Sequence, residues 1–194
     1  MTQIILATAS PYRQEAFRFL DLNFVAQGSD IDEYFEWRPD SPQELVLCLA
    51  KLKAEAIIKN YDKGIIIGFD SVGLLNWQVL EKPKSRKEAF ERLQALSGDK
   101  HQLYTGIYMK NLDTGKELSK HAITDAEMRK LSDIEINKYL DQDSRFKTYA
   151  LGYDTLSHYS STFVIRIEGS YNNLTRGIPL ETIMEMLFEI WYKL

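Results

Sequence analysis

Apolar and polar positions along the first sixty residues follow two periods, which predicts strands and helices in alternation. Residues 3–8 form a short apolar run typical of a buried strand, and residues 23–27 predict a second strand. Between them, Ser10 is placed to cap a helix whose first residue is Pro11. The apolar face of that helix is expected to contain Tyr12, Ala16, Phe19 and Leu20.

The next segments predict a long helix, a buried strand and a hairpin. A capping box at residues 41–44 starts a helix that extends to about residue 60. Residues 64–68 are a continuous apolar run, which is typical of a strand covered on both faces. Residues 72–80 are then expected to form a hairpin.

The second half of the chain has the same alternation, without a strict βαβ order. Helices are expected at residues 86–97, at residues 133–140 and from Pro179 onward. Strands are expected at residues 101–110, 117–127 and 162–167, with a loop at 169–177. This order predicts one α/β domain over residues 1–194, built on a mixed sheet with flanking helices.

Composition excludes several classes of protein. The 194 residues are 44% apolar, enough for a substantial core, and their net charge of −4 argues against a nucleic acid polymer as partner. The single cysteine, Cys48, excludes an internal disulfide and a thiolate metal site. Residues 1–10 do not resemble a secretory leader, and no run approaches the ~18 apolar residues of a membrane span. We therefore expect no membrane association and a cytoplasmic location.

Arg13 lies in the first turn of a predicted helix, where a cation is electrostatically unfavourable. The amino end of a helix already carries partial positive charge. The arrangement indicates that a strongly negative group binds there, since backbone amides at the helix start and Arg13 would share one phosphate. Because the chain is acidic overall, a bound anion requires a local cluster of cations.

Asp70 follows the apolar run at residues 65–67, at the carboxyl end of a predicted strand. A carboxylate there costs free energy unless it is paired, solvated or bound to a metal. Open α/β sheets also bind their ligands at the carboxyl ends of strands. Two interpretations stay open at this point, namely an aspartate that caps a turn and a functional carboxylate.

Three other charged residues could join Asp70 in one site. Glu33, in an acidic loop, is either a solvated side chain or a second carboxylate that shares a divalent metal with Asp70. Lys53 borders the apolar face of its helix and Lys82 follows the predicted hairpin, positions that are equally typical of solvated lysines. Together with Arg13, these lysines would suit a triphosphate–metal complex, because charge must be neutralised on a leaving pyrophosphate.

Short motifs along nearly the whole chain then identify a resemblance. They are LATASPYR at 6–13, DIDE at 30–33, LAKLKAEAI at 49–57, IIGFDSV at 66–72, EKPKSRKEA at 81–89, LSG at 96–98, YTGI at 104–107, IEGSYNN at 167–173 and GIPL at 177–180. In this order they resemble the Maf (septum-formation-like) nucleoside triphosphate pyrophosphatases.

The resemblance implies an elongated α/β fold of the Maf/ITPase-like type, with two lobes around a nucleotide cleft. Members of the family often form dimers, so a homodimer is expected. They cleave a nucleoside triphosphate between the α and β phosphates and release a monophosphate and pyrophosphate. The reaction needs a divalent metal cation, so the implied cofactor is Mg²⁺ or Mn²⁺.

The resemblance also assigns roles to individual residues. Asp70 matches the general base that activates water, and Glu33 would bind the metal together with Asp70. The positions that match phosphate-binding residues are Ser10, Arg13, Lys53 and Lys82. A late loop with a less defined role contributes Glu168, Ser170 and Asn172.

Tyr12, Ser71 and Ser157 occupy the positions that the family links to base choice, and each departs from the dTTP/UTP subgroup. An aromatic residue before Arg13 resembles the subgroup that prefers 7-methyl-GTP, since a flat ring can stack on a cationic base. Packing of Tyr12 on its own helix is the other interpretation. We expect removal of non-standard or surplus nucleotides, with 7-methyl-GTP as one candidate. The alternatives are dTTP/UTP hydrolysis and a non-catalytic nucleotide-binding paralogue linked to cell division.

Overall fold

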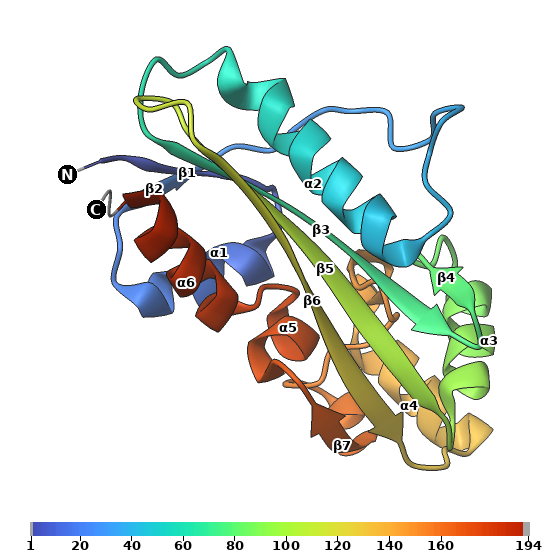
Figure 1. Ribbon diagram of the computed structural model, residues 1–194. Coiled ribbons are helices and arrows are strands. Elements are labelled where there is room, and N and C mark those ends of the chain that lie inside the picture. The colour runs from blue at the N-terminus through green and yellow to red at the C-terminus, as the bar shows by residue number, and fades with distance from the viewer. Residues whose placement is uncertain (1, 192–194) are drawn as a thin grey trace. The chain divides into compact units, whose positions relative to one another are not determined.

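The computed structural model describes residues 2–191, in which helices and strands alternate (Figure 1). The strands are β1 (Ile4–Ala7), β2 (Phe24–Ala26), β3 (Ile65–Leu75), β4 (Gln78–Leu80), β5 (Lys100–Asn111), β6 (Glu117–Met128) and β7 (Val164–Glu168). The α-helices are α1 (Pro11–Phe17), α2 (Pro42–Ile58), α3 (Arg86–Leu96), α4 (Asp133–Gln142), α5 (Tyr171–Arg176) and α6 (Leu180–Trp191). Three 3₁₀ turns in the same residues are η1 (Arg18–Leu20), η2 (Ser144–Thr148) and η3 (Tyr159–Thr162).

Within residues 2–191 the strands form one seven-stranded sheet in the order β2-β1-β3-β5-β6-β7, and β4 pairs with β3 outside this path. β1 runs parallel to both β2 and β3. β3 and β4 pair in antiparallel register, as do β6 and β7. The sheet is therefore mixed, which confirms the fold class expected from the sequence.

The chain divides into two compact units. The first comprises the chain up to Ser71, residues 105–122 and the chain from Arg176 onward, and the second comprises residues 72–104 and 123–175. The long strands β3, β5 and β6 contribute residues to both units. The single domain over residues 1–194 and the cleft between two lobes stay predictions.

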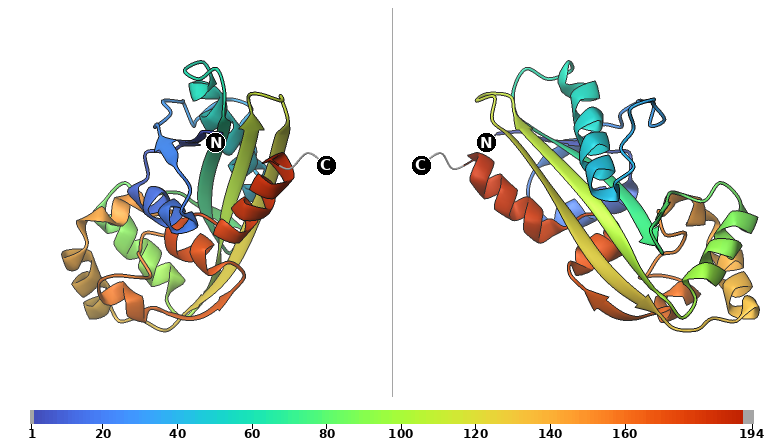
Figure 2. Two further views of the ribbon diagram at one scale, coloured as in Figure 1. Left: turned by 90° about the vertical axis from the view of Figure 1, so that its left-hand side faces the viewer. Right: turned by 45° about the vertical axis from the view of Figure 1, so that its right-hand side comes forward.

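The sheet of the first unit is covered on both faces, because successive side chains of a strand point to opposite sides. Ile65, Ile67 and Phe69 of β3 pack in one core cluster with residues of α1 and α6, which lie beside each other in Figure 1. Ile66 instead packs with Ala54 and other small residues of α2 in a separate cluster. Figure 2 shows α2 and α6 on opposite faces of these strands.

Two glycines allow α2 to lie directly on the backbone of the sheet. A Cβ atom on Gly68 of β3 would collide with the carbonyl oxygen of Ala50. A Cβ atom on Gly106 of β5 would collide with the carbonyl oxygen of Val46 in the same helix. The separation between α2 and the two strands is thus fixed by the absence of side chains at these positions.

The second unit has its own apolar core. Leu93, Tyr139 and Phe163, all buried, belong to one cluster that joins α3, α4 and the segment before β7. The predicted hairpin is present, since a two-residue loop at Asn76-Trp77 connects β3 to β4. Both loop residues have positive φ, 48° and 66°, as this type of tight turn requires.

Three predictions of local structure were wrong. Asp70 was expected at the carboxyl end of a strand, but it lies inside β3, which continues to Leu75. The side chain of Phe19 is 66% exposed, whereas Phe17 is buried, because α1 ends at Phe17 and a 3₁₀ turn follows it. Residues 169–177, expected to be a loop, contain the short helix α5. The hydroxyl of Ser170 accepts a hydrogen bond from the backbone amide of Asn173 at 3.0 Å and so stabilises that helix start.

Candidate active site

Asp70 lies in β3, two residues beyond the point at which β1 stops pairing with it. The register of these parallel strands pairs Ala7 with Gly68, and β1 ends at Ala7. The Asp70 residue is 7% exposed, so its carboxylate is largely removed from water. A buried carboxylate requires a partner of opposite charge.

Lys53 supplies that charge and connects two carboxylates. Its Nζ atom lies 2.5 Å from Oδ1 of Asp70 and 2.7 Å from Oε1 of Glu33. Lys53 is one turn beyond Ala50 on α2, the helix that contacts Gly68 directly, so close packing of helix and strand places it over Asp70. Three residues far apart in the sequence, all in the first unit, thus form one charged cluster.

Burial dominates the electrostatics of this cluster. It raises the pKa of Asp70 above the ordinary value of 3.8, while the positive charges of Lys53 and Arg13 oppose the shift and Glu33 adds to it. Burial likewise lowers the pKa of Arg13 from 12.5, against the opposing influence of Asp70 and Glu33. A carboxyl group with a raised pKa is better suited to accept a proton near neutral pH than an ordinary aspartate.

Arg13 is held by the two neighbours of Asp70 in the sequence, Phe69 and Ser71, and by Gly177. Its Nη2 atom donates to Oγ of Ser71 at 2.7 Å, and Nη1 lies 3.5 Å from the carbonyl oxygen of Phe69. Its Nε atom donates to the carbonyl oxygen of Gly177 at 2.8 Å. The guanidinium carbon also lies 5.6 Å from the centroid of the Phe69 ring. The orientation of Arg13 is therefore defined by residues of β3 and of the segment before α6.

Ser10 begins α1 as the sequence predicted. Its side chain is the N-cap and lies 3.5 Å from the backbone nitrogen of Arg13, and Pro11 is the first helical residue. The backbone amide of Ser10 donates to Oγ1 of Thr8 at 3.1 Å. The half-buried Tyr12 follows in the same turn. These contacts give the turn a defined conformation directly beside Arg13.

The remaining predicted residues belong to the second unit. Lys82 is exposed on the segment between β4 and α3. The hydroxyl of Ser157 donates to the carboxylate of the buried Asp154. Glu168 forms an ion pair of 3.2 Å with Arg166. The roles expected for Lys82, Ser157 and the late loop Glu168, Ser170 and Asn172 stay predictions.

Two residues around Arg13 were not identified from the sequence. Thr105 of β5 contacts Oγ of Ser71 at 2.7 Å between hydroxyl oxygens, and Gly177 contributes its carbonyl oxygen. Both lie in motifs that carry the family resemblance, YTGI at 104–107 and GIPL at 177–180, but the resemblance assigned a role to neither residue. Only the pairing of strands and the position of α6 bring them to Arg13.

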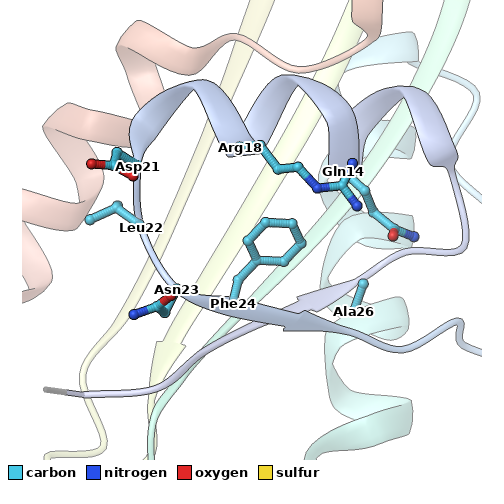
Figure 3. Close-up of a pocket in the computed structure, with 7 residues that line it drawn as sticks. All are labelled: Gln14, Arg18, Asp21, Leu22, Asn23, Phe24 and Ala26. Atoms are coloured by element: carbon cyan, nitrogen blue, oxygen red, sulfur yellow. The ribbon is translucent and has the colours of Figure 1, made fainter.

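A pocket of about 450 Å³ lies elsewhere in the first unit, between α1 and β2 (Figure 3). Figure 3 shows Gln14 of α1 and Arg18 of the following turn η1 facing Phe24 and Ala26 of β2. None of the site residues predicted from the sequence lines it. The charged cluster is therefore identified by its chemistry and not by this cavity.

The charged cluster of Asp70, Lys53 and Glu33 provides only two of the oxygen ligands that a divalent cation needs. Within residues 2–191 no group of three or more His, Cys, Asp or Glu residues could hold a metal. Glu33 and Asp70 do converge on one point, since both contact the same nitrogen of Lys53. Two carboxylates together with substrate phosphate oxygens are a common Mg²⁺ environment, so the donor set fits a metal that arrives with a nucleotide.

Comparison with known proteins shows the family of this chain. The family model described as "Maf-like protein" matches residues 3–190. The chain belongs to the Maf-like family. A relative from Clostridium botulinum (strain Hall), named dTTP/UTP pyrophosphatase, is 36% identical to this Maf-like chain over 194 residues and covers 98% of both proteins. A relative with the same name from Desulforamulus reducens is 35% identical over 187 residues and covers 96% of both.

A solved structure supports the fold of this Maf-like chain. The Staphylococcus aureus Ham1 protein superimposes with a TM-score of 0.57 and 14% identity, covering 98% of this chain and 100% of the other. This likeness confirms the expected type of fold. Within residues 2–191, no helix has the length and apolar character needed to cross a bilayer.

Proposed function

We propose that this Maf-like chain hydrolyses a nucleoside triphosphate between the α and β phosphates and releases a monophosphate and pyrophosphate. It is a hydrolase of the nucleoside triphosphate pyrophosphatase class. The observation that carries the proposal is the Lys53 ammonium, in contact with Asp70 at 2.5 Å and Glu33 at 2.7 Å. Because the curated relatives are named dTTP/UTP pyrophosphatases, dTTP and UTP are the first substrates to test.

Asp70 is the general base in this proposal. Its burial raises its pKa, and its partner Lys53 keeps a positive charge beside the carboxylate. The ionised carboxylate takes a proton from the attacking water, which then adds to phosphorus as the bond to pyrophosphate breaks. Asp70 then gives this proton to the leaving pyrophosphate or to solvent, which regenerates the carboxylate for the next cycle.

Glu33 and Asp70 would hold the divalent cation. When bound, Mg²⁺ or Mn²⁺ supplies positive charge to the phosphate oxygens of the leaving pyrophosphate. The contact of both carboxylates with Lys53 supports this assignment, because two acids are already directed to one cationic position. Lys53 itself would then move its ammonium to a phosphate oxygen.

Arg13 would orient the triphosphate. Its guanidinium is fixed by Ser71 and Gly177, and a guanidinium has five N–H donors, so donors remain for phosphate oxygens. Ser10, in the same turn, would add a hydroxyl or backbone contact. Lys82 of the second unit is the further phosphate ligand that we propose.

A nucleotide panel tests the proposal. Purified protein with Mg²⁺ or Mn²⁺ should release pyrophosphate from at least one NTP or dNTP, with dTTP and UTP preferred. The panel includes 7-methyl-GTP, because Tyr12, Ser71 and Ser157 are the residues proposed to select the base. Release from none of the nucleotides, together with measurable binding of one in a titration calorimeter, would instead support a non-catalytic nucleotide-binding protein.

A further inference from the structure

The side chain of Arg13 is fixed at both ends of its guanidinium. Nε donates to the carbonyl oxygen of Gly177 at 2.8 Å, and Nη2 donates to Oγ of Ser71 at 2.7 Å. Arginine has a large number of rotamers in solution, so two directed hydrogen bonds restrict it strongly. The orientation of the charge therefore depends on the groups that fix Gly177 and Ser71.

Ser71 is in turn fixed by Thr105. The two hydroxyl oxygens lie 2.7 Å apart, the usual distance of an O–H···O hydrogen bond, and either of them can be the donor. Thr105 is 0% exposed and lies on β5, next to β3 in the sheet. Because it is fully buried, Thr105 cannot itself touch a nucleotide.

The hydroxyl of Ser71 has one proton and two lone pairs. One lone pair accepts from Arg13, and the contact with Thr105 uses either the proton or the second lone pair. Without the Thr105 hydroxyl, Oγ of Ser71 could rotate away, because χ1 of serine has three staggered positions of similar energy. Arg13 would then lose the acceptor of its terminal nitrogen.

Gly177 completes the contact from the other side. Its φ is +63°, a conformation that residues with a side chain rarely adopt. A Cβ atom there would lie 3.5 Å from Oγ of Ser71 and 3.7 Å from Nε of Arg13, in ordinary van der Waals contact. A side chain at position 177 would thus be strained by its backbone and would fill the space beside the guanidinium.

We propose that Thr105 is a positioning residue, which acts through Ser71 to hold the Arg13 guanidinium in the orientation that receives a substrate phosphate. This inference rests on the proposed function, since it assumes that Arg13 binds phosphate. The contact of Thr105 with Ser71 and its complete burial support this role. Ser71 would then have a second role, besides the base choice proposed for it.

Two variants of Thr105 test the hydrogen bond. Thr105→Val keeps the shape of the side chain and removes its hydroxyl, whereas Thr105→Ser keeps the hydroxyl. We expect Thr105→Val to lower kcat/KM for dTTP about tenfold and to weaken inhibition by inorganic pyrophosphate to a similar extent. Thr105→Ser should stay within about twofold of wild type. Tyr61→Phe, which removes a hydroxyl that donates to Gln27 in the same unit, is the matched control and should change neither constant.

A double-mutant cycle separates positioning from general packing. In an Arg13→Ala background, Thr105→Val should have no further effect, because the group that it orients is absent. An equal effect of Thr105→Val in both backgrounds, or wild-type constants for Thr105→Val alone, would overturn the inference. Thr105→Cys, which weakens the hydrogen bond without enlarging the residue, gives the same comparison if the valine variant does not fold.

The two proposals fail in different ways. If the wild-type protein releases pyrophosphate and Thr105→Val equals it, only the positioning role of Thr105 is wrong. If the wild-type protein releases pyrophosphate from no nucleotide, the proposed function is wrong, and the positioning role that rests on it is wrong as well.

Discussion

The ammonium group of Lys53 lies 2.5 Å from the buried carboxylate of Asp70, although the two residues belong to different elements, α2 and β3. The contact neutralises Asp70 in part and at the same time brings Glu33 to it through the same nitrogen. Removal of either partner of a buried pair leaves a charge without compensation. The properties of Asp70, both as an acid and as a proposed base, thus depend on Lys53.

Asp70→Asn should abolish turnover without destabilising the protein. Asparagine keeps the shape and can still accept a hydrogen bond from Lys53, but it cannot accept a proton, so we expect kcat to fall about 10³-fold. The Lys53 ammonium stays paired with Glu33 at 2.7 Å, and removal of the buried carboxylate relieves its desolvation cost, so the melting temperature should equal or exceed that of wild type. Pyrophosphate release and a thermal melt measure both. Unchanged turnover would remove Asp70 from the role of base.

The pH dependence of activity should follow the raised pKa of Asp70. A general base acts only when ionised, so kcat/KM should rise with pH through an apparent pKa above the ordinary 3.8. Lys53→Met removes a charge that lowers this pKa, so the acid limb of the profile should move to higher pH while the residual rate falls. A limb that stays in place in this variant would argue that another group titrates.

Glu33→Gln should weaken binding of the divalent metal and leave the stability of the fold nearly unchanged. The amide cannot supply a negative charge to a divalent cation, so the Mg²⁺ concentration for half-maximal activity should rise about tenfold. Glu36→Gln is the matched control, since Glu36 is an exposed acid of the same loop. Equal Mg²⁺ curves for the two variants would exclude Glu33 as a metal ligand.

His101 should make the stability of the protein pH-dependent. It is 2% exposed, its Nε2 atom lies 2.7 Å from the hydroxyl oxygen of Tyr153, and burial lowers its pKa from 6.5 to about 4. Between these two pH values the unfolded chain binds more protons than the folded one. Stability is therefore complete above pH 6.5 and is lost as the pH falls toward 4, by about 3 kcal/mol for this group.

Denaturant unfolding at several pH values measures this contribution. His101→Gln should flatten the dependence between pH 6.5 and 4, whereas His121→Gln, at a partly exposed position of β6, should not. Parallel curves for wild type and His101→Gln would mean that carboxylates alone cause the acid sensitivity.

Helix starts could be predicted from the sequence because their signals are local. Ser10 and the capping box that begins at Ser41 each start a helix as the sequence predicted, and Ser85 and Ser132 cap the helices expected from residues 86 and 133. The error at Phe19 arose because helical periodicity does not indicate where a helix ends, and here Asp21 adopts a left-handed conformation after a 3₁₀ turn. Local signals therefore identified most of the elements, but they missed the short helix α5 and the end of α1 at Phe17.

The site could be predicted only in part, for the same reason. An arginine at a helix start indicated a nearby negative group, and Asp70 does influence Arg13 electrostatically. The direct partners of Arg13 are different, namely the hydroxyl of Ser71 and the carbonyl oxygen of Gly177. The contact of Lys53 with two acids is set by the packing of α2 on β3, which no spacing in the sequence determines.

At Gly68, α2 packs directly against the backbone of β3, and this contact affects how variants of this enzyme class should be interpreted. A methyl group at position 68 would push α2 away from β3 and lengthen the distance between the Lys53 ammonium and the Asp70 carboxylate. The pKa of Asp70 would then change, although the substitution does not touch Asp70. Loss of activity after such a change would look like a folding defect, yet its origin would be an electrostatic distance.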